Sequence, residues 1–497
     1  MEILYVTSEA VPFAKTGGLA DVCGTLPKEV ARLGHRTALI LPGYRAALEE
    51  AGSVEPVPVD IRVPIGNKVV AGSLVRTTLA GSDAPVYLVC NDEYFDRPGI
   101  YGDAAGDYSD NCERYVFFCR AVLEAIHGTE LAPDLLHLND WTTGLIAALT
   151  KIEYAGVPGF ERLALLFTIH NLAYQGTFWH WDMLLTGLDW KYFNWHQMEA
   201  YGQLNLLKTG LVFSDAITTV SPRYAQEIQS APLGCALEGV LQQRRDVLTG
   251  ILNGCDYGQW NPQTDLHIAA QYNVDSFAEG KATCKAALQE ELGLPVRADV
   301  PLLAFVGRLS EQKGLDLLGE VLKEWLQSAD AQWVVLGTGD AGYHELLIDL
   351  GRRYPQKLAA RIEFSDQLAH RIEAGADMFL MPSRFEPCGL SQLYSLKYGT
   401  LPVVRATGGL ADTITDLTPA SLAAGTANGF SFQDASPLAL SETLHRACNV
   451  FTQQKEVWAQ VVRTAMLQDW SWSRSAEQYV SLYADTIQRV RQGVYAR

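Results

Sequence analysis

The sequence of 497 residues is poor in basic side chains, since 39 lysines and arginines stand against 57 aspartates and glutamates, for a net charge of −18. Nucleic acids and anionic membranes are bound through basic surfaces, so this charge argues against both as partners. The chain has no run of about 18 apolar residues, so we expect no membrane-spanning helix. An uncharged polymer such as a glucan is compatible with an acidic surface.

The nine cysteines are scattered, and no two of them form a Cys-x-x-Cys pair. The first apolar run, Ile3–Val6, has no basic segment before it and is too short for a secretory signal. We therefore expect reduced thiols and a cytoplasmic location.

Several nucleotide-binding motifs are also missing. A nicotinamide dehydrogenase needs Gly-x-Gly-x-x-Gly after its first strand and an acidic residue at the end of its second. Here the first turn lacks that spacing, and the second expected strand ends in Leu41-Pro42-Gly43. The chain has no Walker A loop, and no Asp-x-Asp pair that could hold a metal on a diphosphate. We therefore set aside hydride transfer and nucleotide hydrolysis.

Short apolar runs alternate with helical patterns along the chain. The expected strands are 3–6, 37–41, 86–89, 135–138, 165–169 and 216–220, then 302–306, 333–336, 362–364, 378–381 and 401–404, with a possible hairpin within 50–85. This alternation predicts an α/β fold of two doubly wound parallel-sheet domains. We expect the two domains to face each other across a deep cleft. The predicted parts are a first domain over 1–253, a second over 254–475, and a C-terminal helix over 476–497 that returns to the first domain.

A glycine-rich turn, Lys15-Thr16-Gly17-Gly18-Leu19-Ala20-Asp21, joins the first strand to the first helix. Adjacent glycines let the backbone approach a ligand, and N–H groups at a helix start favour anions. The stretch Thr407–Asp412 repeats six of these seven residues. We expect one copy in each domain, with the chemistry between them.

Two cations, Arg308 and Lys313, follow the strand expected at 302–306. They could neutralise a departing diphosphate, or they could be two exposed charges at a helix start. The loop Gly337–Asp340 and the helix start at Gly389 favour the first interpretation, because backbone N–H groups supply further donors. Neutralisation by cations and backbone, without a metal, is the economical hypothesis.

Together these motifs resemble bacterial glycogen synthase and the starch synthases of plants. The resemblance extends from residue 1 to about residue 485 and rests on Lys15–Asp21, His170–Gly176, Gly307-Arg308 with Lys313-Gly314, Pro382–Leu390 and Thr407–Asp412. It implies a GT-B fold with an acceptor-side N-terminal domain and a C-terminal nucleotide-sugar domain. It implies transfer of glucose from ADP-glucose to the non-reducing 4-OH of an α-1,4-glucan (glycogen, starch or malto-oligosaccharide), with retention at the anomeric carbon, no metal and no cofactor.

The resemblance also implies roles for single residues. Those implied in catalysis are Glu386 and His170 at the donor glucose, Arg308 and Lys313 on the diphosphate, and Lys15 on the nucleotide sugar. Further contacts to the nucleotide sugar are implied for Gly17, Gly18, Asn253, Gly339, Phe364, Cys388, Gly389, Leu390 and Thr407. The acceptor side is implied at Tyr101, Asp140, Trp141 and Asn171.

Two positions depart from related transferases. Many of those enzymes carry a second glutamate eight residues after the first, where this chain has Tyr394, so we expect no catalytic carboxylate pair. Phe364 stands at the family's adenine-facing tyrosine and keeps a stacking face without the hydroxyl.

Alternatives stay open at this stage. They are a glucan synthase that uses UDP-glucose, a glucan phosphorylase, which would need a pyridoxal phosphate lysine, and a non-catalytic glucan-binding protein of the same fold. The dense aromatics between residues 178 and 195 either stack on glucan or cover a sheet edge. The sequence indicates no oligomeric state.

Overall fold

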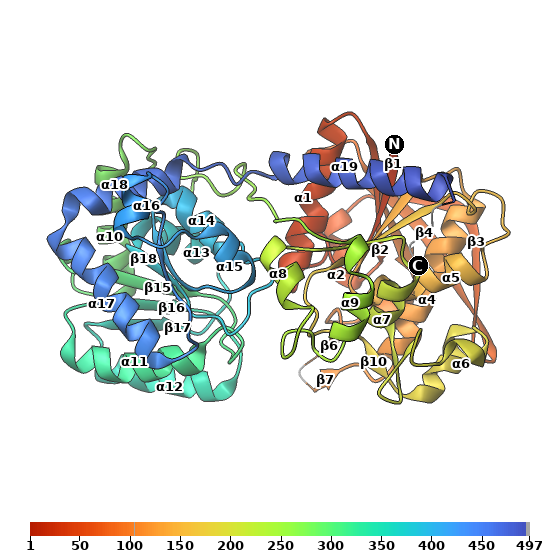
Figure 1. Cartoon of the computed structure of the whole chain (residues 1–497), viewed down its shortest axis with the longest axis horizontal. Helices are drawn as coiled ribbons and strands as arrows, with labels where there is room; N and C mark the ends of the chain where they lie inside the picture. Colours follow the sequence, from red (N-terminus) through yellow and green to blue (C-terminus); the bar gives the residue numbers. More distant parts are fainter. Residues whose placement is uncertain (104, 494–497) are drawn as a thin grey trace. The chain divides into compact units, whose positions relative to one another are not determined.

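The computed structural model describes residues 1–103 and 105–493 and divides into two compact units. The first comprises Met1–Asn253 and the C-terminal segment from Trp472, and the second is Gly254–Ser471. The C-terminal helix α19 (Trp472–Arg491) begins four residues before the predicted 476. Its start is fixed by burial, because Trp472 and Tyr479 pack into the core of the first unit, where α19 lies along α1 (Gly18–Arg32) (Figure 1).

The described part of the first unit is built on a nine-stranded sheet. In spatial order its strands are β14 (Leu248–Gly250), β13 (Ala216–Thr219), β9 (Ala164–Ile169), β8 (Leu135–Asn139), β1 (Glu2–Val6), β2 (Arg36–Pro42), β5 (Pro85–Cys90), β4 (Lys68–Thr78) and β3 (Glu55–Ile65). All neighbours pair in parallel from β14 to β5, whereas β4 and β3 form an antiparallel hairpin. The hairpin expected within 50–85 is therefore present.

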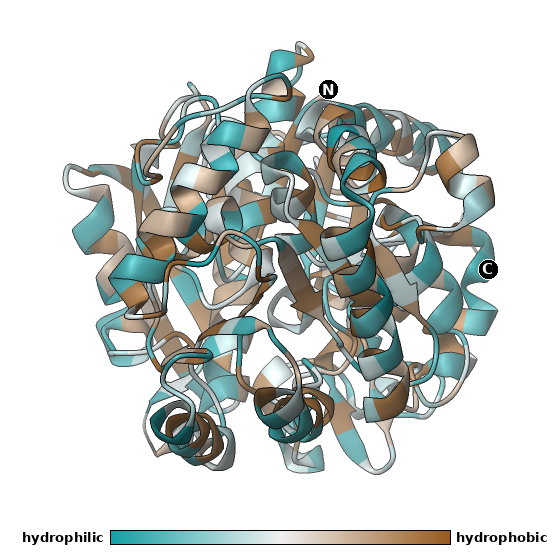
Figure 2. Ribbon diagram, turned by 90° about the vertical axis from the view of Figure 1, so that its left-hand side faces the viewer, coloured by the Kyte–Doolittle hydropathy of each residue, from teal (hydrophilic) through white to brown (hydrophobic). Residues whose placement is uncertain are grey.

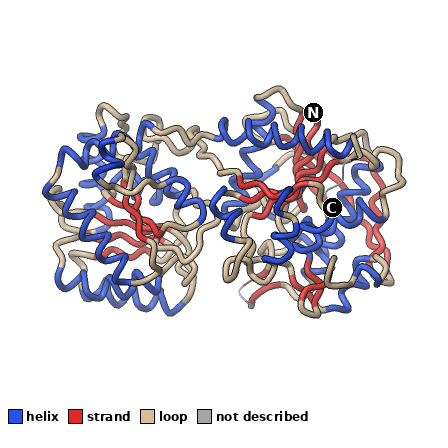
Figure 3. The backbone as a smooth tube through the Cα atoms, viewed as in Figure 1, coloured by secondary structure: helices blue, strands red, loops and turns tan. Residues whose placement is uncertain are grey.

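The central strands are apolar because helices cover both of their faces. All six residues of β9 are buried, and so are all five of β8. The helices around the sheet include α4 (Asn111–Gly128), α5 (Gly144–Ile152) and α7 (Leu206–Phe213). Figure 3 shows the strands at the centre of each unit, and Figure 2 shows hydrophobic strands among helices that carry hydrophilic stretches. This is the layered α/β arrangement that the alternating pattern predicts.

The described part of the second unit holds a six-stranded parallel sheet. Its spatial order is β17 (Leu358–Arg361), β16 (Gln332–Leu336), β15 (Leu302–Val306), β18 (Met378–Met381), β19 (Leu401–Arg405) and β20 (Phe430–Phe432). Its helices are α10 (Phe277–Leu292), α11 (Leu315–Ser328), α12 (Ala341–Arg353), α13 (Asp366–Gly375), α14 (Ser391–Tyr398), α15 (Gly408–Thr413), α16 (Pro419–Ala423), α17 (Pro437–Gln453) and α18 (Lys455–Leu467).

One predicted strand is displaced along the chain. The strand expected at 362–364 lies instead at Leu358–Arg361, because Leu358 and Ala359 are the buried residues of this segment, whereas Phe364 is 82% exposed. Phe364 therefore belongs to the loop that follows the carboxyl end of β17.

Each sheet has a topological switch point, where consecutive crossovers leave in opposite directions. Strand β1 lies between β2 and β8, and strand β15 lies between β16 and β18. Ligands of open parallel sheets bind outside the carboxyl ends of strands at such points. The loops after β1, β8 and β9, and those after β15, β16 and β18, are therefore where a site is expected in each unit.

Smaller elements lie outside the two main sheets. Strands β10 (Thr177–Phe178), β12 (Gln203–Asn205) and β11 (Glu199–Ala200) form a small antiparallel sheet. Between β10 and β11 the chain forms the short helices η2 (His180–Asp182), α6 (Met183–Thr186) and η3 (Trp190–Tyr192). Among the described helices, none is long and apolar enough to span a membrane.

Candidate active site

The turn after β1 presents Lys15 at the surface of the first unit. Its Nζ lies 2.8 Å from Oδ1 of Asp21, and the two side chains are 44% and 24% exposed. Gly17 has an extended backbone with φ of −159°, and a Cβ built on it would meet no atom within 4 Å. The turn is thus an open loop at the surface, and its lysine forms an ion pair with Asp21.

The turn is held in place by Glu9, a buried residue that the sequence analysis missed. Its Oε2 accepts the backbone N–H groups of Thr16 at 2.5 Å and Gly17 at 3.2 Å. Its Oε1 accepts hydroxyl hydrogens from Thr16 and Tyr101, both at 2.7 Å. Two backbone donors that could face an anion are therefore already occupied by this carboxylate. The only signal in the sequence was one acidic residue soon after the first strand.

Tyr101 connects this turn to the loop after β8. Its hydroxyl lies 2.8 Å from the Ser8 hydroxyl, which in turn accepts a hydrogen bond from Thr142 at 3.1 Å. The ring of Tyr101 is 6.1 Å from that of Trp141, centroid to centroid. The structure thus connects Tyr101 through Glu9 to the turn that carries Lys15, and it places the Tyr101 ring beside that of Trp141.

Asp140 and His170 interlock at the carboxyl ends of β8 and β9. The His170 backbone N–H donates to Oδ1 of Asp140 at 2.8 Å, and burial raises the pKa of the Asp140 carboxyl to about 7. Asp140 has a φ of 55°, in the left-handed region that aspartate tolerates better than most residues. Asn171 follows in the same loop, where its side chain accepts from the Ala173 N–H at 3.1 Å.

The protonation state of His170 follows from its partner. The Asn139 side-chain nitrogen donates to the carbonyls of Val6 and His137, so its Oδ1 must be the acceptor that lies 2.9 Å from Nε2 of His170. Burial also lowers the pKa of His170 to about 3, which keeps the ring neutral. Nε2 therefore carries the single proton, and Nδ1 is a hydrogen-bond acceptor.

Asn253 ends the first unit at the connection to the second. It is 6% exposed, and its Oδ1 is buried without a hydrogen-bond partner among the described residues. A buried amide oxygen in this state costs free energy unless a ligand or water satisfies it.

In the second unit, Lys313 and Glu386 form an ion pair between the loops after β15 and β18. Nζ of Lys313 lies 2.6 Å from Oε2 of Glu386, with side chains 28% and 7% exposed. The Ser383 hydroxyl donates to the same oxygen at 3.0 Å. The two loops are also packed together, because Gly314 has a φ of 76° and a Cβ there would lie 2.1 Å from the Pro382 carbonyl. Arg308 is exposed at the start of the first of these loops.

The loop after β16 does spell Gly-x-Gly-x-x-Gly, over Gly337–Gly342, although the first turn of the chain does not. A Cβ on Gly337 would lie 1.8 Å from the Gly307 carbonyl, and one on Gly339 would lie 2.3 Å from that of Leu309. Leu309 N–H donates to the Thr338 carbonyl at 2.8 Å, and Asp340 N–H donates to that of Leu309 at 2.9 Å. These glycines therefore let the loop carrying Arg308 lie flat on its neighbour.

The second Gly-Gly copy supports the loop that carries Glu386. A Cβ on Gly408 would lie 2.0 Å from the Glu386 carbonyl, and one on Gly409 would lie 2.1 Å from that of Cys388. Gly409 N–H donates to the carbonyls of Glu386 and Pro387, both at 3.2 Å. Thr407, which precedes the pair, is buried.

Gly389, which has a φ of 75°, lies two residues before Ser391, the first residue of helix α14. Its residue Gln392 donates from Nε2 to the carbonyls of Cys388 and Gly389, at 3.1 and 3.0 Å, while Leu390 caps the helix. Tyr394 stacks on Trp260 with ring centroids 4.1 Å apart, so this position serves packing rather than a second carboxylate.

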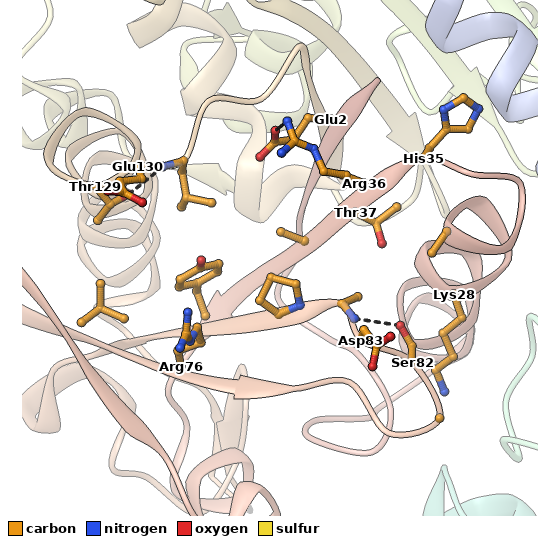
Figure 4. Close-up of a pocket in the computed structure, with 18 of the residues that line it drawn as sticks. Glu2, Lys28, His35, Arg36, Thr37, Arg76, Ser82, Asp83, Thr129 and Glu130 are labelled. Atoms are coloured by element: carbon orange, nitrogen blue, oxygen red, sulfur yellow. Dashed lines mark hydrogen bonds and ion pairs between the residues drawn. The ribbon is translucent and has the colours of Figure 1, made fainter.

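A pocket of about 970 Å³ in the first unit lies at the opposite edge of the sheet (Figure 4). It is lined at the amino ends of β1, β2 and β5, by residues such as Glu2, Arg36 and Tyr87. The Arg36 guanidinium lies 2.5 Å from the Glu2 carboxylate. No residue predicted for the site lines this pocket.

Two protein-family models match this chain. A family model described as "Starch synthase catalytic domain" matches residues 2–243, and one described as "Glycosyl transferases group 1" matches residues 293–451. A glycogen synthase from Rhodopirellula baltica is 48% identical over 98% of both chains, and one from Syntrophotalea carbinolica is 46% identical over 98% of this chain and 99% of its own.

The chain belongs to the glycogen and starch synthase family. It is therefore a glycosyltransferase enzyme, as the resemblance implied.

A solved structure of this family supports the same assignment of fold. The catalytic domain of starch synthase IV from Arabidopsis thaliana, bound to ADP and acarbose, is 31% identical with a TM-score of 0.90, over 98% of this chain and 99% of that one. The expected GT-B fold is therefore confirmed. A sucrose-phosphate synthase from Thermosynechococcus elongatus, 16% identical with a TM-score of 0.58, shares the fold alone.

Proposed function

We propose that the protein elongates an α-1,4-glucan by transferring glucose from ADP-glucose to the non-reducing 4-OH, with retention at the anomeric carbon. The observation that carries the proposal is the near-complete match to a starch synthase structure that holds ADP and an oligosaccharide, acarbose. The donor is the sole small molecule that the proposed reaction needs, with neither metal nor cofactor.

The departing diphosphate develops negative charge, and three cations of this chain suit it. Arg308 and Lys313 follow β15, and Lys15 follows β1. Fixed cations and backbone donors aimed at developing charge act strongly in a site that excludes water. Lys313 already contacts Glu386, so we propose that Glu386 holds the ammonium group in place until the diphosphate shares it.

Glu386 then orients the donor glucose. Its carboxylate is buried and accepts hydrogen bonds from Ser383 and Lys313, which leaves remaining acceptor capacity for sugar hydroxyls. We assign it this role rather than that of a nucleophile. The 4-OH of the acceptor attacks the anomeric carbon on the face that ADP leaves, the bond to the phosphate oxygen breaks, and that oxygen takes the hydroxyl proton.

The first unit supplies groups for the sugars. Nδ1 of neutral His170 can accept a hydrogen bond from a sugar hydroxyl, and the unpartnered Oδ1 of Asn253 can accept one from a second hydroxyl. Tyr101 and Trp141 offer ring faces for the acceptor, while the Asp140 and Asn171 side chains offer polar atoms beside them. We propose Phe364, an exposed ring after β17, as the stacking partner of the adenine.

Counting labelled glucose moved from ADP-glucose onto glycogen tests the proposal. We expect transfer by the parent protein, a kcat/KM lower with UDP-glucose, and α-anomeric product bonds. Glu386→Gln should lose most of its turnover; near-normal turnover would contradict the role of this carboxylate. Absence of any transfer with either donor would favour a non-catalytic glucan-binding protein.

A further inference from the structure

A strip of aromatic rings lies exposed on the first unit, outside the groups described above. We call Trp179, His180, Trp181, Trp190 and Phe193 the tryptophan strip. Consecutive ring centroids are 5.3 Å apart from Trp179 to His180 and from His180 to Trp181, then 5.5 Å to Trp190 and 5.0 Å to Phe193. The three tryptophans are 62%, 49% and 41% exposed, so they do not form a buried cover over the sheet.

The base beneath the strip is firmly anchored, although the rings face outward. Met183 and Thr186 of the same segment are fully buried. Buried Arg120 donates from Nε to the Thr186 carbonyl at 3.1 Å and pairs with Glu153 at 2.9 Å. Gly187, with φ of 75°, lets the chain turn where a Cβ would lie 2.5 Å from the Arg120 guanidinium. A segment that buries Met183 and Thr186 while its tryptophans stay exposed is organised for contact with something else.

The strip begins one residue after a ring that contacts the residues implied for the acceptor side. The Trp141 ring lies 5.7 Å from that of Phe178 and 6.1 Å from that of Tyr101. Phe178 precedes Trp179 directly, in the short strand β10. Ring contacts therefore run from Tyr101 through Trp141 to Phe178, and the tryptophan strip begins at the next residue of the chain.

The charge of the strip restricts its partner. Asp182 and Asp189 lie within the segment, with Lys191 as its one lysine or arginine between residues 178 and 195, in a chain of net charge −18. Nucleic acids and anionic membranes need a basic surface. A glucan has no charge, and the C–H faces of its glucose rings stack on aromatic rings.

We propose that the tryptophan strip binds the glucan acceptor beyond its reacting end. Long glucans would then bind more tightly and dissociate more slowly, whereas glucans too short to reach the strip would bind no more tightly. The proposal rests on the proposed function, because it assigns a glucan to the same acceptor side.

The test compares the parent with Trp181→Ala/Trp190→Ala in the full chain. Retention of the protein by glycogen in affinity electrophoresis is the first measurement. The second is kcat/KM for glycogen against kcat/KM for maltotriose, both with ADP-glucose. We expect each lost ring to weaken glycogen retention about fivefold, and kcat/KM to fall more for glycogen than for maltotriose. The control is Tyr201→Ala, because Tyr201 is a still more exposed aromatic (80%) in the turn between β11 and β12. It should change neither the retention by glycogen nor the ratio of the two kcat/KM values.

Parent-like retention and an unchanged ratio in the double variant would overturn the proposal. A dimer that becomes monomeric in light scattering, with unchanged glycogen retention, would assign the strip to a second copy of the chain and also overturn it. If the double variant unfolds at a lower temperature than the parent, the single variant Trp179→Ala repeats the comparison with one ring removed. Glycogen retention needs no donor, so the binding result stands even when no glucose is transferred, and the two proposals fail separately.

Discussion

Two copies of the sequence Thr-Gly-Gly-Leu-Ala-Asp begin helices α1 and α15, and the structure uses them differently. In the first copy, Gly17 has no atom within 4 Å of a built Cβ, and the turn carries Lys15 at the surface. In the second, Gly408 and Gly409 are pressed against the backbone of Glu386 and Cys388, and Ala406 stands where the first copy has its lysine. The first copy presents a cation, and the second supports a neighbouring loop.

The difference between the two turns comes from what each turn packs against, because their sequences are nearly identical. The first turn is braced from beneath by the Glu9 carboxylate, which leaves its outer side open. The second is braced by main-chain carbonyls of the loop after β18, which leaves no room for a methyl group. Each turn thereby lies beside one ion pair, Lys15 with Asp21 at the surface and Lys313 with Glu386 in a largely buried position.

The largest effect should come from the buried pair. We expect Lys313→Ala to lower kcat by about 10²-fold or more, the scale for losing one group that stabilises developing charge. It also leaves Glu386 buried without its cation, so unfolding should need less denaturant. Steady-state kinetics with ADP-glucose and a urea titration measure both effects.

Lys323→Ala is the matched control for that change, because Lys323 is an exposed lysine on α11 paired with Glu320. It should leave kcat unchanged and alter stability by less than about 1 kcal/mol. A Lys313→Ala variant whose only change is a higher KM would contradict a role on the departing diphosphate.

The two copies can be compared directly by one substitution made in each. Gly409→Ala places a Cβ 2.1 Å from the Cys388 carbonyl, so we expect a loss of about 1–3 kcal/mol of stability and displacement of the Glu386 loop. Gly17→Ala meets no atom, and its φ of −159° suits alanine, so stability should stay within about 0.5 kcal/mol. Urea titrations of both variants decide the matter. Equal losses would show that the copies are packed alike.

Glu9 offers a way to sharpen the description of the first copy. Glu9→Ala leaves the N–H groups of Thr16 and Gly17 without their acceptor, which we expect to cost about 1–3 kcal/mol and to raise KM for ADP-glucose. Glu9→Gln should restore most of the stability and most of the KM for ADP-glucose. Its amide oxygen can accept the N–H groups while its NH₂ donates to the hydroxyls of Thr16 and Tyr101. A glutamine variant as impaired as the alanine variant would mean that the negative charge itself is needed.

Much of the fold could be predicted from the sequence because apolar runs in parallel sheets are nearly continuous. Strands such as β9 and β15 lie within one residue of their predicted ends. The run at 362–364 misled because the burial that fixes β17 comes from Leu358 and Ala359, which apolar spacing alone did not single out. Propensity places a strand only to within a few residues, and packing decides the rest.

The candidate site was less predictable than the fold. Lys313 and Glu386 are 73 residues apart, and they meet only because β15 and β18 are neighbours in the sheet, which the chain order does not state. Glu9 belongs to no sequence pattern, because it is a single acidic residue whose partners are two backbone N–H groups and two hydroxyls. Motifs therefore indicated candidate residues, whereas packing decides which copy of the glycine pair is open and which is closed.

The effect expected at Asp140, close to the open copy, appears only as a pH dependence of stability. Burial raises the pKa of its carboxyl from 3.8 to about 7, so between those pH values the folded chain holds a proton that the unfolded chain has lost. Stability contributed by this group is therefore present below about pH 4 and lost as the pH rises to about 7.

Asp140→Asn keeps an oxygen that can accept from the His170 N–H and removes the titration. We expect the variant to gain stability relative to the parent as pH rises from about 4 to 7, with no further gain above. Urea titrations at several pH values measure this difference, in which the contribution of His170 cancels because both proteins contain it. A difference that does not vary with pH would mean that the Asp140 carboxyl titrates normally and is better solvated than its surroundings indicate.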